Sequence, residues 1–161
     1  MEDARTGDSR RARALVYAAL PDRLHVEIVS GVGTTQAILD AGAGRVAITV
    51  PRERVSYVGR ADPRALGALV GLPASPEELV RALLLGETTT LAVVREGAVG
   101  SLPQRLRLRT SEGSLELRLR SVEPLRADAA ALGTGLAPPG MDPRSIEELW
   151  DDPSRVRSES P

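Results

Sequence analysis

Two short helices with clear start and stop signals are predicted in the middle of the chain, over residues 62–71 and 75–86. Each starts with a capping residue followed by proline and ends at a glycine: Asp62, Pro63 and Gly71 in the first helix, and Ser75, Pro76 and Gly86 in the second. Glu78, three residues after Ser75, is expected to complete a capping box. Because helices this short are unstable alone in water, both must pack on an apolar surface that the rest of the chain supplies.

Short antiparallel strands are predicted before the helix pair, because apolar and polar residues alternate there with a period of two. The expected strands cover residues 12–19, 24–28, 36–39, 45–50 and 55–59. Turns rich in glycine, proline and charge separate them, at residues 21–22, 30–34, 40–44 and 51–54. Val46, Ile48 and Val50 are expected to point inward. The pattern indicates a meander of strands that leads into the helices.

The clearest hairpin follows the helices, with strands at 104–109 and 114–120 and a turn at Glu112-Gly113. Leucines occupy one face and arginines the other. The arginine face is either a solvated surface with cross-strand Arg–Glu pairs or a surface that meets phosphate or lipid headgroups. Residues 122–125 are expected to extend the second strand, and residues 146–150 to form a short helix.

Composition excludes several kinds of chemistry in this chain of 161 residues. Without lysine there is no phosphate-binding P-loop, and without cysteine there is no disulfide, thiol nucleophile or thiolate metal site. His25 is the only histidine and is expected to face solvent or a neighbouring strand residue rather than act as a base or ligand. The net charge of −1 and the scarcity of aromatic residues argue against nucleic-acid binding. We therefore expect no enzyme activity, no metal and no cofactor.

The fold predicted from these elements is α+β, with a single curved antiparallel sheet whose apolar face is covered by short helices to form a half-barrel. One domain is expected over residues 12–150, between disordered segments at 1–11 and 151–161. Aliphatic residues would line an apolar cavity under the helices; the candidates are Val26, Ile28, Val46, Ile48, Leu69, Leu83, Leu106 and Leu117.

The loop at residues 30–34 carries a large aliphatic residue, Val32, between Gly31 and Gly33. Two interpretations are open for a residue of this kind at a loop tip. Val32 either folds back onto the sheet or projects outward to contact a membrane or an acyl chain. The second interpretation makes residues 31–33 a membrane-insertion loop.

The order of these segments resembles the LolB family of outer-membrane lipoprotein receptors and its bacterial lipoprotein relatives. The resemblance runs from about Ala14 to Gly86 and continues more weakly through the late hairpin to Pro138-Pro139-Gly140. The residues that carry it are Pro21-Asp22-Arg23-Leu24-His25-Val26-Glu27-Ile28, Ser30-Gly31-Val32-Gly33, Tyr57-Val58-Gly59, Leu69-Val70-Gly71-Leu72-Pro73-Ala74-Ser75-Pro76-Glu77-Glu78-Leu79-Val80 and Leu84-Leu85-Gly86. The resemblance implies a LolA/LolB-like half-barrel that binds the acyl chains of lipoproteins. It also implies a periplasmic LolA-like carrier as partner, a place on the periplasmic face of the outer membrane, and a bilayer-inserting role for Val32.

Two functions are therefore expected as alternatives. The first is a non-enzymatic protein that accepts acylated lipoproteins or lipids in an apolar cavity for outer-membrane localisation. The second is a structural or assembly module of the cell envelope, with a filled core, that binds a partner protein through its sheet. The charged segment at residues 1–13 lacks the apolar run of a signal peptide, and the printed sequence lacks a lipobox cysteine.

Overall fold

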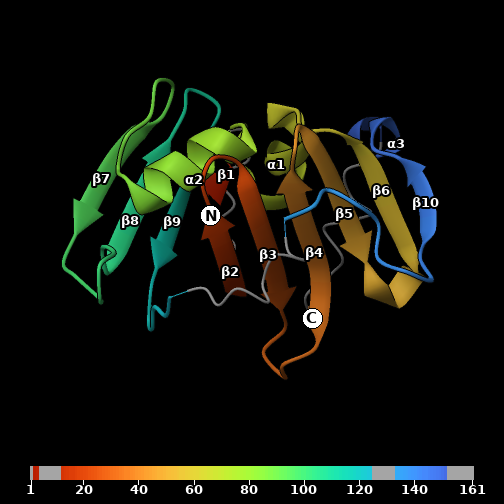
Figure 1. Ribbon diagram of the computed structural model, residues 1–161, viewed down its shortest axis with the longest axis horizontal. Coiled ribbons are helices and arrows are strands. Elements are labelled where there is room, and N and C mark those ends of the chain that lie inside the picture. Colours follow the sequence, from red (N-terminus) through yellow and green to blue (C-terminus); the bar gives the residue numbers. More distant parts are fainter. Residues whose placement is uncertain (1, 4–11, 125–132, 152–161) are drawn as a thin grey trace.

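The computed structural model of the chain describes residues 2–3, 12–124 and 133–151 (Figure 1). The strands are β1 (Glu2–Asp3), β2 (Arg13–Ala19), β3 (Arg23–Val29), β4 (Thr35–Gly42), β5 (Arg45–Val50), β6 (Val55–Arg60), β7 (Ala92–Glu96), β8 (Arg105–Arg109), β9 (Gly113–Arg118) and β10 (Asp142–Ser145). The helices are η1 (Pro51–Glu53), α1 (Pro63–Val70), α2 (Pro76–Leu84) and α3 (Glu147–Asp151).

The strands form two sheets, with order β10-β6-β5-β4-β3-β2 in the larger and β1-β9-β8-β7 in the smaller. The sheets lie toward opposite ends of the long axis of the molecule (Figure 1). Every described pairing is antiparallel except that of β10 with β6. The predicted α+β class with mainly antiparallel strands is confirmed. The prediction of a single, wholly antiparallel sheet is wrong, because β2 and β9 do not pair and β10 returns beside β6 in the parallel direction.

The predicted meander before the helices is confirmed, but one of its turns is shorter than expected. Strand β4 continues through Gly42, so the turn to β5 consists of Ala43 and Gly44 alone. Both residues adopt left-handed conformations, with φ of 51° and 72°. Two residues of this kind suffice to join twisted antiparallel strands. Asp40, predicted to lie in the turn, is therefore a strand residue.

Three predictions outside the meander also need correction. Glu2–Asp3, expected to be disordered, pairs with β9, whereas residues 4–11 and 152–161 lie outside the described part of the chain. The second strand of the late hairpin ends at Arg118, so residues 122–124 do not extend it. Gly113 belongs to β9 rather than to the turn. The short helix expected near residues 146–150 is confirmed as α3.

Both predicted helices form, and their predicted N-caps, Asp62 and Ser75, are confirmed. The Asp62 side chain accepts a hydrogen bond from the backbone N–H of Arg64 at 2.7 Å, and Ser75 Oγ accepts one from Glu78 N–H at 3.2 Å. The reciprocal half of the capping box is absent, because the Glu78 carboxylate instead accepts hydrogen bonds from Thr89 and Thr90. These bonds tie the start of α2 to the loop that leads into β7.

One hydrophobic core joins the two sheets and the helices. The large sheet contributes the predicted inward residues Val46, Ile48 and Val50, and the small sheet contributes Leu106 and Leu108. Residues from the helices complete the cluster; among them are Leu66, Leu79, Val80, Leu83 and Leu149. The apolar surface that α1 and α2 require is therefore shared by both sheets.

The start of β9 passes so close to the linker between α1 and α2 that a side chain does not fit. A Cβ added at Gly113 would overlap the carbonyl oxygen of Gly71, whereas a Cβ at Gly31 would meet nothing within 4 Å. We expect Gly113→Ala to destabilise the protein by about 1–3 kcal/mol, because the backbone must move to relieve the overlap. Urea unfolding measures the change. Gly31→Ala is the control, and equal stability of the two variants would contradict this packing.

Candidate functional site

The predicted cavity residues lie together in the core. Five of them are buried members of the single cluster: Val26, Val46, Ile48, Leu83 and Leu106. Ile28 and Leu117 are partly buried and pack against it, while the side chain of Leu69 lies outside the described part of the structure. The elements that bring them together are β3, β5, α2, β8 and β9. The sequence pattern therefore identified residues that share one interior.

This interior is closed around its central side chains. Val46, Ile48 and Leu106 each have 0 % of their surface exposed, so they contact other protein atoms rather than open space. Leu83 and Val26 are 6 % and 7 % exposed. Any ligand would reach these residues only if elements that share this core moved apart.

One polar atom in this interior has no hydrogen-bond partner. Tyr57 lies on the core face of β6 and is fully buried, and its hydroxyl is the one buried side-chain N or O atom without a partner among the described residues. A buried hydroxyl without a partner costs about 1–3 kcal/mol. Tyr57 pairs with Ile48 on β5, which places it on the core face, but no signal in the sequence indicated that its hydroxyl would be unpaired.

The loop between β3 and β4 presents Val32 to solvent. The side chain of Val32 is 90 % exposed, so it does not fold back onto the sheet. Ser30 holds the loop in shape, because its carbonyl oxygen accepts from Gly33 N–H at 3.0 Å and its Oγ accepts from Thr34 N–H at 3.1 Å. Gly33 takes a positive φ of 86°, whereas Gly31 does not. Hydrogen bonds to Ser30 thus close the loop, and Val32 forms its exposed apolar tip.

A charged cluster lies on the opposite face of the large sheet from the core. His25 on β3 is 8 % exposed, and each of its ring nitrogens faces a carboxylate oxygen: Nδ1 is 2.8 Å from Asp40 and Nε2 is 3.0 Å from Glu27. A carboxylate only accepts, so both nitrogens must carry protons to make both bonds. The expectation that His25 faces a neighbouring residue is confirmed.

Asp40 also holds the chain segment that precedes β10. Its carboxylate accepts hydrogen bonds from the backbone N–H groups of Gly133, Thr134 and Gly135, at 2.5–3.0 Å. From there the segment crosses β4 and β5 toward β10 (Figure 1). The cluster therefore fastens the C-terminal part of the chain to the sheet. Sequence reasoning missed it because Asp40 was assigned to a turn.

The hydrogen bonds decide the charge states in this cluster. Burial by itself lowers the pKa of His25, but the bonds to Asp40 and Glu27 outweigh it and place the pKa above 6.5. Burial raises the pKa of Asp40, but the bonds from His25 and the three backbone N–H groups leave it below its ordinary value. At neutral pH Asp40 is ionised, and both shifts favour an ion pair with His25.

The arginine face of the small sheet forms Arg–Glu pairs across its strands, as the first of the two interpretations of this face predicts. Glu116 accepts from Arg107 Nε at 2.9 Å and from Arg118 Nε at 2.8 Å. Arg105 pairs with Glu96 at 3.3 Å. These bonds, together with nearby Arg105, hold the pKa of Glu116 at about 2. The face is an ordered network of charges on the outside of the molecule.

Neither a metal-binding cluster nor a membrane-crossing helix occurs among the described residues. No protein-family model matches the chain, and no curated protein matches it either. The geometry of the closed interior, the Val32 loop and the charged clusters is therefore the basis for a functional proposal.

The pH dependence of stability tests the His25 cluster. Because the pKa of His25 is raised in the folded protein, its stabilisation is complete below about 6.5 and is lost as the pH rises through the folded pKa. We expect the urea midpoint to fall as the pH rises from about 6.5 through the pKa of His25 in the folded protein. His25→Gln should be less stable at the lower pH and lack this fall. A wild-type midpoint that stays constant across the range would contradict the protonated pair.

Proposed function

We propose that this protein is a non-enzymatic lipid-binding protein of the LolB-like, half-barrel type. It would accept the acyl chains of lipoproteins or other lipids into the interior beneath α1 and α2, at the periplasmic face of the outer membrane. A LolA-like carrier would deliver them. The proposal unites an aliphatic interior, a helical cover and an exposed apolar loop in one activity.

The observation that carries the proposal is the unpaired hydroxyl of Tyr57 inside the aliphatic interior. A lipid ester or amide carbonyl would give this hydroxyl an acceptor and remove its cost of about 1–3 kcal/mol. The acyl chain itself would contribute about 0.8 kcal/mol for each CH₂ group that leaves water. Affinity would then come from apolar burial, and one hydrogen bond would fix the position of the ligand.

The helical cover gives this binding a structural route. The helices α1 and α2 have eight and nine residues, and both are stabilised mainly by packing on the sheets. Displacing them would open the interior where Leu83 contributes to the core. In the proposed complex, an acyl chain would replace contacts that the helices make with the core.

A second candidate function is a module that binds a partner protein through its sheet. The complete burial of Val46, Ile48 and Leu106 favours it, because a filled core needs no ligand. The edge strand β2 presents Leu15 and Val16, which are 52 % and 40 % exposed. Only the lipid-binding candidate requires the Tyr57 hydroxyl to bind a ligand.

Replacing Tyr57 by phenylalanine distinguishes the candidates. For a lipid carrier we expect binding of a fluorescent fatty acid to weaken about fivefold, equivalent to about 1 kcal/mol for the lost hydrogen bond. The ligand-free variant should be at least as stable as wild type, because an unpaired buried hydroxyl has been removed. Tyr17→Phe, on the other face of the sheet, is the control. No fatty-acid binding and no co-purifying lipid in native mass spectrometry would exclude the lipid-binding proposal.

Replacing Val32 by glutamate tests the loop separately. We expect at least about tenfold weaker binding to phospholipid vesicles, because burial of a valine side chain contributes about 1.5 kcal/mol and the new charge resists insertion. Fatty-acid binding in solution should stay unchanged. Leu20→Glu places the same charge at an exposed residue in the turn at the other end of β3. Vesicle binding that is equal in both variants would remove the loop from the proposal.

A further inference from the structure

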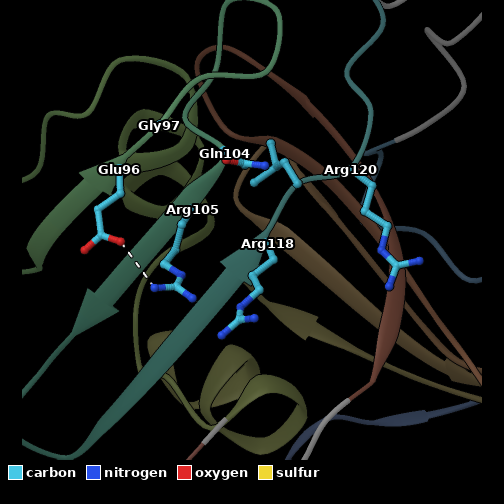
Figure 2. Close-up of a pocket in the computed structure, with 7 residues that line it drawn as sticks. Glu96, Gly97, Gln104, Arg105, Arg118 and Arg120 are labelled. Atoms are coloured by element: carbon cyan, nitrogen blue, oxygen red, sulfur yellow. Dashed lines mark hydrogen bonds and ion pairs between the residues drawn. The ribbon is translucent and has the colours of Figure 1, made fainter.

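We propose that a pocket on the outer face of the small sheet binds the phosphate of an anionic lipid headgroup. The pocket has a volume of about 440 Å³ and lies where β8, β9 and the loop after β7 meet (Figure 2). This size is within the range of small-ligand sites, roughly 300–1,000 Å³. The inference deepens the proposed function, because the headgroup as source of the phosphate rests on lipid binding.

Two arginines stand directly opposite each other in this pocket. Arg105 on β8 and Arg118 on β9 are cross-strand partners, an arrangement that is unfavourable for like charges unless an anion lies between them. Glu116 supplies one anion, because its Oε1 is 3.4 Å from Arg105 Nε and 2.8 Å from Arg118 Nε. Both arginines thus contact the same Glu116 oxygen through Nε. The terminal nitrogens of Arg118 make no ion pair among the described residues.

A third arginine, Arg120, adds positive charge without an ion-pair partner among the described residues. Arg120 lines the pocket just beyond the end of β9, and no carboxylate of the described residues lies within ion-pair distance of it. The charged residues that line the pocket, taken together with their ion-pair partners, are four arginines and two glutamates, with a net charge of +2; they are Arg105, Arg107, Arg118, Arg120, Glu96 and Glu116. The pocket therefore attracts an anion after its internal pairs are satisfied.

The walls of the pocket suit a headgroup. Gly97 has a positive φ of 64°, and a Cβ there would lie 3.0 Å from Gln104, so glycine permits the close approach of this loop to β8. Gln104 offers an amide that can donate to a phosphate oxygen, and Leu119 adds an apolar surface. Guanidinium groups match phosphate oxygens with paired donors. Because none of the described residues that line the pocket is aromatic, base stacking has no partner there and a nucleic acid is a poorer fit.

The pocket and the Val32 loop lie toward the same edge of the molecule. The loop after β7, the end of β9 and the loop between β3 and β4 all lie toward the lower edge of the molecule in Figure 1. A membrane surface at this edge would meet an apolar tip and an arginine pocket together. Val32 would enter the acyl region, and the arginines would remain at the depth of the phosphates.

Vesicle binding with and without anionic lipid tests this inference on the full chain. Wild type, Arg120→Gln and Arg109→Gln are compared on phosphatidylcholine vesicles and on vesicles that also contain phosphatidylglycerol. Arg109 is the control, because it lies on the same face of β8, is exposed and is outside the pocket. We expect Arg120→Gln to weaken binding to the anionic vesicles about fivefold and Arg109→Gln to have a smaller effect.

Titration with inorganic phosphate, followed by NMR of the arginine side chains, separates the sources of the ligand. Phosphate shifts together with a dependence on phosphatidylglycerol, both lost in Arg120→Gln, support a headgroup site. Phosphate shifts without that dependence overturn the headgroup assignment and indicate free phosphate. Equal effects of the two variants, or no binding of either probe, overturn the pocket itself. Fatty-acid binding is measured on the same samples. If the protein binds anionic vesicles and phosphate but no fatty acid, the result contradicts the proposed function and not the phosphate pocket.

Discussion

Burial of aliphatic side chains between two sheets and two short helices holds this protein together. The chain has one tryptophan, two tyrosines and no phenylalanine, so leucine, valine, isoleucine and alanine supply nearly all of the apolar area. Neither sheet could cover its own apolar face, and neither helix is stable alone. Leu106 and Leu108 from one sheet, Val46 and Ile48 from the other, and Leu79 from α2 therefore depend on one another for burial.

The two faces of the large sheet are stabilised by different forces. On the core face the contacts are apolar and have little directional preference. On the other face Asp40 accepts directed hydrogen bonds from His25 and from the segment at 133–135. An ionised carboxylate that is buried requires such partners. The sheet is thus anchored by polar contacts on the side away from the proposed lipid site, where rigidity does not hinder opening.

The proposed activities use separate parts of this scaffold. Tyr57 lies within the closed interior, Val32 at the tip of a tight loop, and Arg120 beside a network of ion pairs on the small sheet. A lipid has parts that match each place: an acyl chain for the interior, and a headgroup phosphate for the arginines. The proposed arrangement depends on binding surfaces alone and needs no reacting group.

Local patterns in the sequence determined most of the elements and the sorting of their faces. The caps at Asp62 and Ser75, the inward leucines of the late hairpin and the residues of the shared interior were all predictable, because they depend on nearest neighbours along the chain. Contacts between distant residues were decided only by the tertiary structure. These include the hydrogen bond that Asp40 accepts from Gly133 N–H, the parallel pairing of β10 with β6, the unpaired hydroxyl of Tyr57 and the pocket around Arg120. No local period encodes them, since they follow from where separate segments meet once the common core has formed.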